Sequence, residues 1–372
     1  MKKSYLFGMF ALAAMTMVGC SNDEVVENFS QDNAIEFGTY MGRDVQSRAE
    51  IFETSDLQAD GVGFGVFAYY TGQTAWKDYT VPASPNFMNN THVTYTAGTN
   101  EASGSWTYSP LKYWPNNVGD KVSFFAYAPY STTADNYMGV DKGIINLKVP
   151  NEVKNQIDLT AVTDHKIDQT KTTLDQKVEF KFNHVLTRIQ FTLQAAADQV
   201  EPGGTINEGT TITLNSVTIG GTKEGQGGFY DNGFYSIFDN TWTNCTGNQA
   251  FTLDADDFIE DSNILTSEDG GNDKREIVAD GSYIMVIPQF VEGFPVTVNY
   301  TVHTADNNAN AEDDSSTITN NITTIVKGLH FEANRVFRFN LVLGMSTVEL
   351  SATVGTWDDG NNHQVDLPLN QK

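Results

Sequence analysis

The stretch from residue 178 to residue 193, VEFKFNHVLTRIQFTL, changes its hydrophobic phase half-way along. Up to Asn183 the apolar residues occupy even positions, and beyond His184 the alternation resumes on odd positions. In order, these residues are Val178, Phe180, Phe182, Ile189, Phe191 and Leu193. A period of two is typical of a strand with one buried face, and a slip of one residue turns the apolar side chains to the other face. Such a strand is either bulged or passes from one core to another, so we predict a joint between two β domains at Asn183–His184.

The composition favours an all-β chain with two β-sandwich domains. The 372 residues are too many for one ordinary sandwich and give ample core for two. Aromatic residues form 12% of the chain, in short runs bounded by turn residues, and no long apolar stripe of helical period follows the first twenty residues. The predicted domains are residues 49–183 and 184–372. The predicted strands are residues 61–70, 105–108, 121–127, 143–149, 178–183, 188–194, 211–219, 229–238, 249–253, 283–287, 295–303, 334–343, 348–354 and 363–369, with turns at 83–90 and 113–120.

The first nineteen residues have the pattern of a signal peptide. Two lysines precede an apolar run from residue 5 to residue 18, which is too short for a stable membrane anchor. The run ends in Met-Val-Gly before Cys20, which resembles a bacterial lipobox, so we expect Cys20 to become the lipidated N-terminus. The following Ser-Asn-Asp-Glu resembles the acidic tetrad that sends Bacteroidales lipoproteins to the outer face of the outer membrane. The alternative is a plain secretory signal with an incidental cysteine. The other cysteine is Cys245, so a lipidated Cys20 excludes an intramolecular disulfide.

Residues 20–48 are predicted to form a propeptide that contains one detachable strand. Most of this segment is polar and acidic, but four residues of one island alternate as in a strand. These are Ile35, Phe37, Thr39 and Met41. Arg43 and Arg48 follow in a stretch that looks exposed, where proteolysis concentrates. We expect a trypsin-like, arginine-specific protease to cut between Arg48 and Ala49, with Arg43 as the second choice.

Six stretches, in the same order, resemble signature stretches of the fimbrillins. They are GVFAYY (65–70), KYWP with SFFAYAP (112–115 and 123–129), FKFNHVLTRI (180–189), YIMVIPQ (283–289), GLHFEANRVFRFNLVL (328–343) and ATVGTWDDG (352–360). Fimbrillins are lipoprotein pilins of the Bacteroidales. The resemblance implies two transthyretin-like β-sandwich domains in tandem, a cell-surface fimbria as the location, and assembly with other copies or related pilins. Phe331 stands where a tryptophan is more usual, a change that the core tolerates.

The C-terminal segment has the pattern of a donor strand. Val365, Leu367 and Leu369 alternate with polar residues, and Pro368, which has no N–H, should face an unpaired side. Loss of the strand around Phe37 would open a groove, and the C-terminal strand of another copy would fill it. Repetition of this step gives a head-to-tail polymer. The alternative is that both segments are ordinary edge strands of a monomer.

Charge and motifs exclude several other classes of function. The formal net charge of −25 opposes nucleic-acid binding, which needs a basic face. The glycine-rich stretches lack the helix and GK[ST] of a phosphate loop, and the six histidines show no zinc-binding spacing. We therefore predict no catalytic residues, no cofactor and no metal site, with membrane contact only through the lipid on Cys20 before cleavage. A loose calcium site in an acidic loop stays open.

Two other functions are alternatives to a polymerising pilin. The first is a monomeric outer-membrane glycan-binding lipoprotein or a tip adhesin, which would use exposed aromatic residues such as Trp106, Trp114 or Trp242. The second is a surface hydrolase, which the missing triad and carboxylate motifs disfavour. The sequence does not identify an adhesive ligand.

Overall fold

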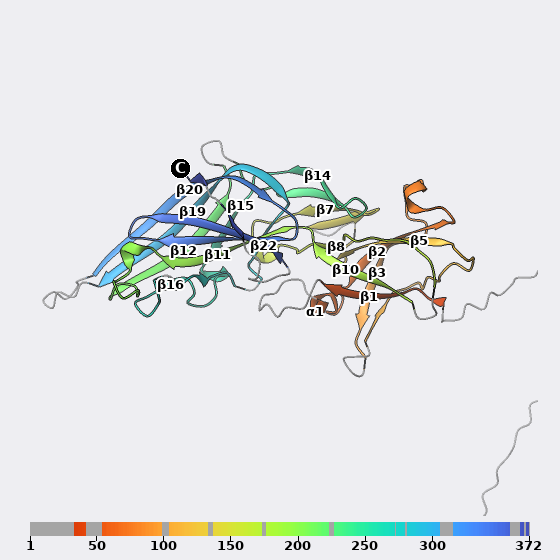
Figure 1. Cartoon of the computed structure of the whole chain (residues 1–372), viewed down its shortest axis with the longest axis horizontal. Coiled ribbons are helices and arrows are strands. Elements are labelled where there is room, and N and C mark those ends of the chain that lie inside the picture. The colour runs from red at the N-terminus through yellow and green to blue at the C-terminus, as the bar shows by residue number, and fades with distance from the viewer. Residues whose placement is uncertain are drawn as a thin grey trace, which may run out of the picture.

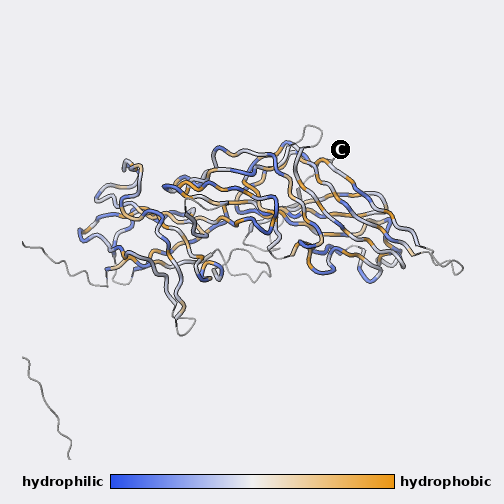
Figure 2. Tube along the Cα trace, turned by 180° about the vertical axis from the view of Figure 1, so that it is seen from behind, coloured by the Kyte–Doolittle hydropathy of each residue, from blue (hydrophilic) through white to orange (hydrophobic). Residues whose placement is uncertain are grey.

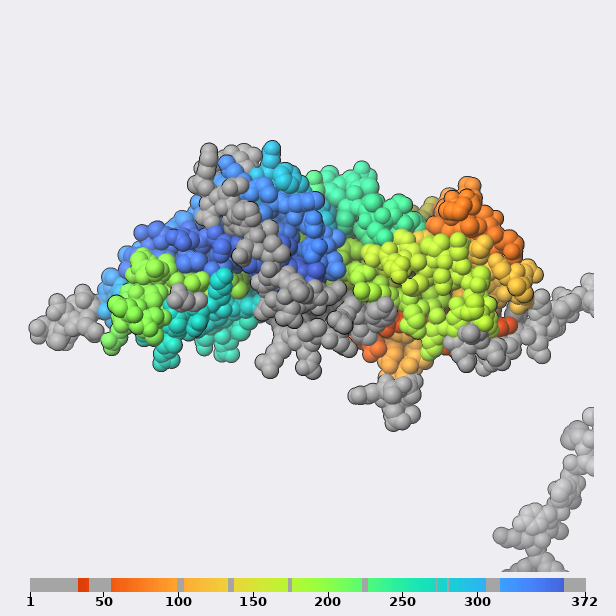
Figure 3. All heavy atoms as spheres, viewed as in Figure 1, coloured from red at the N-terminus to blue at the C-terminus, as the bar shows by residue number. Residues whose placement is uncertain are grey.

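The structure is a computed structural model and describes residues 33–41, 54–98, 104–132, 137–172, 176–222, 227–271, 273–279, 281–305, 315–357, 365–367 and 370–371. The molecule is elongated, with the first half of the chain at one end and the second half at the other (Figures 1 and 3). Strands dominate, so the prediction of an all-β chain is confirmed. The helical elements are short: α1 (Thr54–Leu57), η2 (Trp76–Asp78), η4 (Val153–Asn155), η5 (Ala197–Gln199) and η6 (Ala255–Asp257). None of the helices in these ranges is long and apolar enough to cross a membrane.

An eight-stranded sheet forms the end that contains the first half of the chain. Its order is β1-β10-β8-β5-β2-β3-β4, and β9 pairs with β5 off this path. The strands are β1 (Glu36–Met41), β2 (Phe64–Gly72), β3 (Met88–Thr96), β4 (Ser105–Thr107), β5 (Lys121–Ala128), β8 (Thr160–Val162), β9 (Lys166–Gln169) and β10 (Lys177–His184). Apolar residues occupy both even and odd positions of β2 and β5, for example Phe124 and Phe125, so these central strands are buried on both faces.

A four-stranded sheet joins the two halves of the chain. Its order is β14-β13-β7-β6. The strands are β6 (Met138–Asp141), β7 (Ile144–Lys148), β13 (Asn232–Ser236) and β14 (Thr241–Thr246). β7 precedes the predicted joint at Asn183–His184 and β13 follows it, yet the two strands pair antiparallel with Leu147 opposite Gly233.

Two six-stranded sheets pack face to face at the other end. One has the order β17-β11-β21-β22-β23, with β18 beside β11, and the other has the order β15-β12-β19-β20-β24, with β16 beside β12. The first contains β11 (Thr187–Ala195), β17 (Arg275–Glu276), β18 (Ile284–Val286), β21 (Arg335–Leu343), β22 (Val348–Thr356) and β23 (Val365–Leu367). The second contains β12 (Thr210–Gly220), β15 (Ala250–Asp254), β16 (Ile264–Leu265), β19 (Gln289–Ala305), β20 (Ser315–Phe331) and β24 (Asn370–Gln371). Apolar and polar residues alternate along these strands (Figure 2), and the rings of Phe331 on β20 and Phe337 on β21 lie 4.7 Å apart between the sheets.

The buried apolar side chains form two clusters, and these do not separate at residue 184. The smaller cluster covers one face of the eight-stranded sheet and includes Phe37 and Phe180. The larger cluster starts on the opposite face of that sheet, at Phe67, and continues through Leu147 into the sandwich around Phe191. The expectation of two cores that part at Asn183–His184 is therefore corrected, because the pairing of β7 with β13 bridges that point. The division into domains 49–183 and 184–372 stays a prediction.

The phase change marks a passage between sheets. β10 ends at His184 in the eight-stranded sheet, and β11 starts at Thr187 in a six-stranded sheet. β11 differs from its prediction in that both faces are buried. Arg188, which alternates with the apolar residues of β11, is only 4% exposed, and its guanidinium carbon lies 3.4 Å from the centre of the Tyr283 ring. Burial lowers the pKa of Arg188 to about 10, which leaves the guanidinium charged at neutral pH.

Candidate assembly site

The predicted detachable strand, β1, is the edge strand of the eight-stranded sheet and runs parallel to β10. The pairing extends from Glu36 opposite Lys177 to Met41 opposite Phe182. Ile35 and Phe37 are 1% and 2% exposed, and Thr39 is half-buried. The alternation in the sequence thus corresponds to a strand with one face in the core.

The ring of Phe37 fills a socket made by four other aromatic rings, here called the aromatic socket. These are Phe64, Tyr108, Phe124 and Phe180, with centroids 6.1, 5.4, 6.0 and 5.4 Å from that of Phe37. The ring stacks on Phe180 and meets Phe64 and Phe124 edge-on. Burial of a Phe side chain stabilises a fold by about 1.5–3 kcal/mol, so this residue contributes strongly to the attachment of β1.

Hydrogen bonds hold the residues just before β1 against a second segment of the chain. The N–H of Ile35 donates to the carbonyl of Lys112 at 2.8 Å, and the N–H of Trp114 donates to the carbonyl of Asn33 at 3.0 Å. The Tyr108 hydroxyl donates to the Ile35 carbonyl at 2.8 Å, and burial raises the pKa of Tyr108 to about 12, which keeps this donor protonated. Two of these partners, Lys112 and Trp114, lie in the KYWP stretch, for which the sequence predicts a turn but no contact with β1.

Part of β10 relies on β1 for its pairing. Among the strands that the structure describes, β8 pairs with β10 only at the C-terminal end of β10, from Phe182 to His184. The residues from Lys177 to Lys181 pair with β1 alone. Removal of β1 would therefore leave this backbone without a partner on either edge and would expose the aromatic socket.

The C-terminal tail, defined as β23 and β24, is folded back on its own chain. In β23, Val365 lies opposite Val354 of β22 and Leu367 lies opposite Ala352. β24 adds to the edge of β20 at Val326 and Lys327. In Figure 1, β1 lies toward one end of the elongated molecule and the C-terminus lies toward the other end.

Trp357, the residue that directly follows β22, stacks on His184 in a contact that is here called the polar clamp. The Trp357 ring stacks on the His184 imidazole with centroids 4.1 Å apart, and Asp158 lies 2.9 Å from His184 Nδ1. His184 and Trp357 are both buried, and the N–H of Trp357 donates to the Asn334 carbonyl at 3.1 Å. His184 is therefore a packed residue at the end of β10. If the tail moves while this clamp stays intact, the chain has to change direction after Trp357.

Comparison with known proteins decides the family. A sequence model described as fimbrillin-like matches residues 47–357. The chain belongs to the fimbrillin-like family. It is 30% identical over 283 residues to the fimbrium subunit Fim1C of Phocaeicola vulgatus, covering 72% of this chain and 70% of that protein. It also resembles the crystal structure of a fimbrial protein from Bacteroides vulgatus, with a TM-score of 0.65, 23% identity, and coverage of 87% of this chain and 99% of that one.

The fimbrillin resemblance is thus confirmed, and the family is one of fimbrial structural and adhesion proteins of the cell surface rather than of enzymes. The predicted lipidation site Cys20 and the cleavage sites Arg43, Arg48 and Ala49 lie outside the described residues, as does Leu369. The side chains of Met41, Val365 and Leu367 also lie outside the description, although their backbones are placed in β1 and β23.

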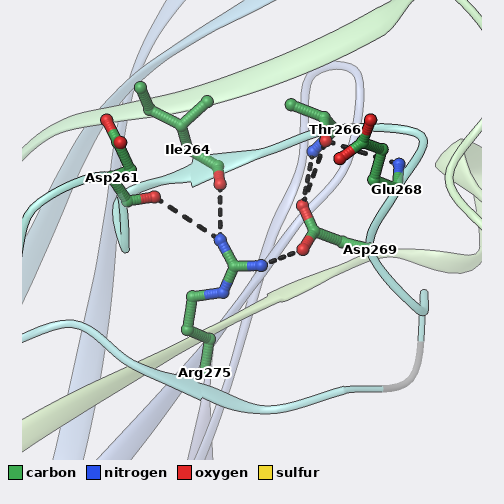
Figure 4. Close-up of polar contacts among 6 residues, drawn as sticks. All are labelled: Asp261, Ile264, Thr266, Glu268, Asp269 and Arg275. Atoms are coloured by element: carbon green, nitrogen blue, oxygen red, sulfur yellow. Dashed lines mark hydrogen bonds and ion pairs between the residues drawn. The ribbon is translucent and has the colours of Figure 1, made fainter.

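The polar clusters elsewhere in this fimbrillin-like chain stabilise local structure. Arg275 donates to the carbonyls of Ile264 and Asp261 and pairs with Asp269, whose other oxygen accepts from Thr266 (Figure 4). This set fastens the loop between β16 and β17 to the sandwich. Glu268 contributes only its N–H, donated to Thr266.

The acidic run at Asp254 also stabilises local structure. It borders a hollow of about 310 Å³ together with Glu152 and Lys154. Asp254 accepts from the N–H of Asp256, and Asp257 accepts from the N–H of Asp254, so these carboxylates cap η6. Within the described ranges, no group of three His, Cys, Asp or Glu side chains is arranged to hold a metal ion.

The three tryptophans that could form a glycan-binding platform lie in different parts of the fold. Trp114 is buried in the core and Trp106 packs edge-on against Phe64. Trp242 is half-buried and donates its indole N–H to the carbonyl of Val185 at 3.0 Å. These contacts give each ring a packing role.

Replacement of Phe37 by Ala is expected to lower the free energy of unfolding of the full-length fimbrillin-like chain by about 3–5 kcal/mol, because it empties the aromatic socket. Denaturant unfolding followed by tryptophan fluorescence measures the change. Glu36→Ala is the matched control, since Glu36 is exposed and its ion pair with Lys177 at 3.6 Å contributes less than about 1 kcal/mol. Equal effects of the two changes would contradict a socket that holds β1.

Proposed function

We propose that this chain is a structural subunit of a cell-surface fimbria, exported as a lipoprotein, cut after an arginine and polymerised by donor-strand addition. The observation that supports this most strongly is the position of β1. It is an edge strand that plugs an aromatic socket and supplies the only pairing, within the described strands, for β10 from Lys177 to Lys181. The printed description of the relative Fim1C as a fimbrium subunit agrees with the proposal.

Cleavage after Arg48 would separate β1 from the rest of the subunit. The cut follows β1 in the chain, so the strand and the lipid on Cys20 would leave together, and 372 − 48 = 324 residues would remain. The remaining subunit would present an unpaired strand edge beside an empty aromatic socket. Such an edge is a template for a strand of another chain.

The C-terminal tail is the proposed donor. The pattern of Ile35 and Phe37 in β1 recurs in the tail as Val365, Leu367 and Leu369, with apolar residues at every second position. Release of the tail breaks its pairs with β22 and β20, whereas the stacking contact between Trp357 and His184 precedes the tail in the chain. Because β1 and the C-terminus lie toward opposite ends of the molecule, each addition forms a head-to-tail contact that does not close.

The export step has its own prediction. A Cys20→Ala variant is expected to lose fatty-acid labelling and to accumulate away from the outer membrane, because the acyl chains anchor the precursor. Labelling with a radioactive fatty acid and membrane fractionation measure both effects. Cys245→Ala is the control and should label normally. Normal labelling of the Cys20→Ala variant would contradict lipidation at this residue.

Electron microscopy of cells that express the chain tests the function as a whole. We expect surface fibres, and N-terminal sequencing of the isolated subunit should begin at Ala49, or at Asp44 if Arg43 is used. Cells that display the chain without fibres, with an N-terminus still at Cys20, would favour the alternative of a monomeric glycan-binding lipoprotein.

A further inference from the structure

β20 has a long free edge. It is a strand of 17 residues that pairs with β19 along its whole length. On its other side, β24 covers only Val326 and Lys327, and none of the remaining described strands pairs with β20 from Ser315 to Ile325. This free edge, residues 315–325, belongs to the β19–β20 hairpin at the end of the molecule away from β1 (Figure 1).

The free edge lacks the features that normally prevent strand pairing. Its sequence, SSTITNNITTI, contains no charged residue and no proline. Most of its side chains are Thr and Ile, which favour strands. Two copies of a chain with a net charge of −25 repel each other over most of their surface, but this edge brings no like charges together.

The order of residues along the free edge fits pairing with itself. If two copies run antiparallel about a two-fold axis at Asn320, polar residues face polar residues and isoleucine faces isoleucine from Ser316 to Thr324. The pairs are Thr319 with Asn321, Ile318 with Ile322, Thr317 with Thr323, and Ser316 with Thr324. Ile–Ile and Thr–Thr pairs across strands are favourable. Ile318, 42% exposed in the single chain, gains an apolar partner in this register.

We propose that the free edge of β20 is an interaction surface for a second copy of this chain, with the two β20 strands antiparallel about Asn320. The pairing joins two six-stranded sheets into one continuous sheet. It also stops where β24 begins, because Ser315 of one copy lies opposite Ile325 of the other, next to Val326, which β24 already covers. In a fimbria this contact joins subunits side by side, and it does not depend on donor-strand addition.

Disulfide trapping with two differently tagged chains tests the register. Full-length chains with Cys20→Ala and Cys245→Ser contain no other thiol. One population carries Thr319→Cys and the other Asn321→Cys, both at exposed positions. Mild oxidation is expected to give mixed dimers as the main cross-linked product on a non-reducing gel, well above dimers of either variant with itself, because only residues 319 and 321 face each other.

Three further measurements make the outcome decisive. Thr317→Cys mixed with Asn321→Cys is the register control and should cross-link several-fold less. Thr252→Cys, on the opposite edge strand of the same sheet, should cross-link with itself no more than this control. If Thr319→Cys instead links to Asp366→Cys, the free edge accepts the tail of another copy and the proposal is wrong. The absence of any dimer across a range of protein concentrations would overturn it as well.

Discussion

A chain that ends at residue 362 is expected to fold and to be processed by the protease, yet to form no fibres. The described core includes Trp357, and the described part of the tail pairs at two sheet edges, from Val365 to Leu367 on β22 and at Val326 and Lys327 on β20. Loss of these pairs therefore leaves a stable subunit without a donor strand. Electron microscopy and size-exclusion chromatography of the processed protein measure fibre length and mass.

Truncated subunits still have a groove, so they also provide a dose-dependent test. Mixed with intact subunits, they should end growing fibres and shorten them in proportion to their share.

Leu367→Glu should act like the truncation, because a carboxylate in an aromatic socket is costly to desolvate. Asp366→Ala, one residue away on the polar side of the strand, should assemble normally. Fibres of normal length from the truncated chain would show that the tail is not the donor.

Replacement of both Arg43 and Arg48 by Ala is expected to abolish fibre formation by keeping β1 in place. The uncut precursor retains the lipid on Cys20, and Phe37 continues to fill the aromatic socket, so no tail can enter. Mass spectrometry of the membrane fraction should find a lipidated chain with residues 20–372. Arg43→Lys with Arg48→Lys keeps both positive charges and should also remain uncut if the protease is specific for arginine.

Replacement of one arginine at a time distinguishes the two candidate cleavage sites. Arg48→Ala alone should move the N-terminus of the mature subunit from Ala49 to Asp44, whereas Arg43→Ala alone should leave it at Ala49. Abundant fibres from the double variant would mean that release of β1 does not depend on these arginines.

Features that follow from local alternation were predictable from the sequence. The island around Phe37 is a strand because one face is apolar and the other polar, and the phase change near His184 marks a passage between sheets. The family resemblance rested on stretches with aromatic and turn residues at fixed offsets, and it is confirmed over residues 47–357.

Features that depend on contacts between distant segments were not predictable in the same way. β20 was not predicted, because SSTITNNITTI is mostly polar and its three isoleucines do not form a regular alternation. Pairing with β19 along the long hairpin holds this part of the strand. β3 begins at Met88 inside a predicted turn, since its pairing with β2 outweighs the turn residues around it. The pairing of β7 with β13 links strands from both predicted domains, and no local pattern encodes such a partner.

The central claim is that, in the fibre, the C-terminal tail of one subunit replaces β1 beside β10 of the next. Disulfide mapping in assembled fibres tests it most directly. Asp366→Cys on the tail is combined with one cysteine on the outward face of β10, at Lys177, Glu179 or Lys181, in a Cys245→Ser background. The three positions cover the registers in which a short donor can pair.

We expect oxidised fibres with one of these combinations to dissolve in detergent as a ladder of covalent multimers, and the same subunits to run as monomers after reduction. The ladder should be absent from the uncut Arg43→Ala, Arg48→Ala precursor, in which β1 still occupies the edge of β10. Fibres that give no ladder with any of the three positions would contradict donor-strand addition at this groove.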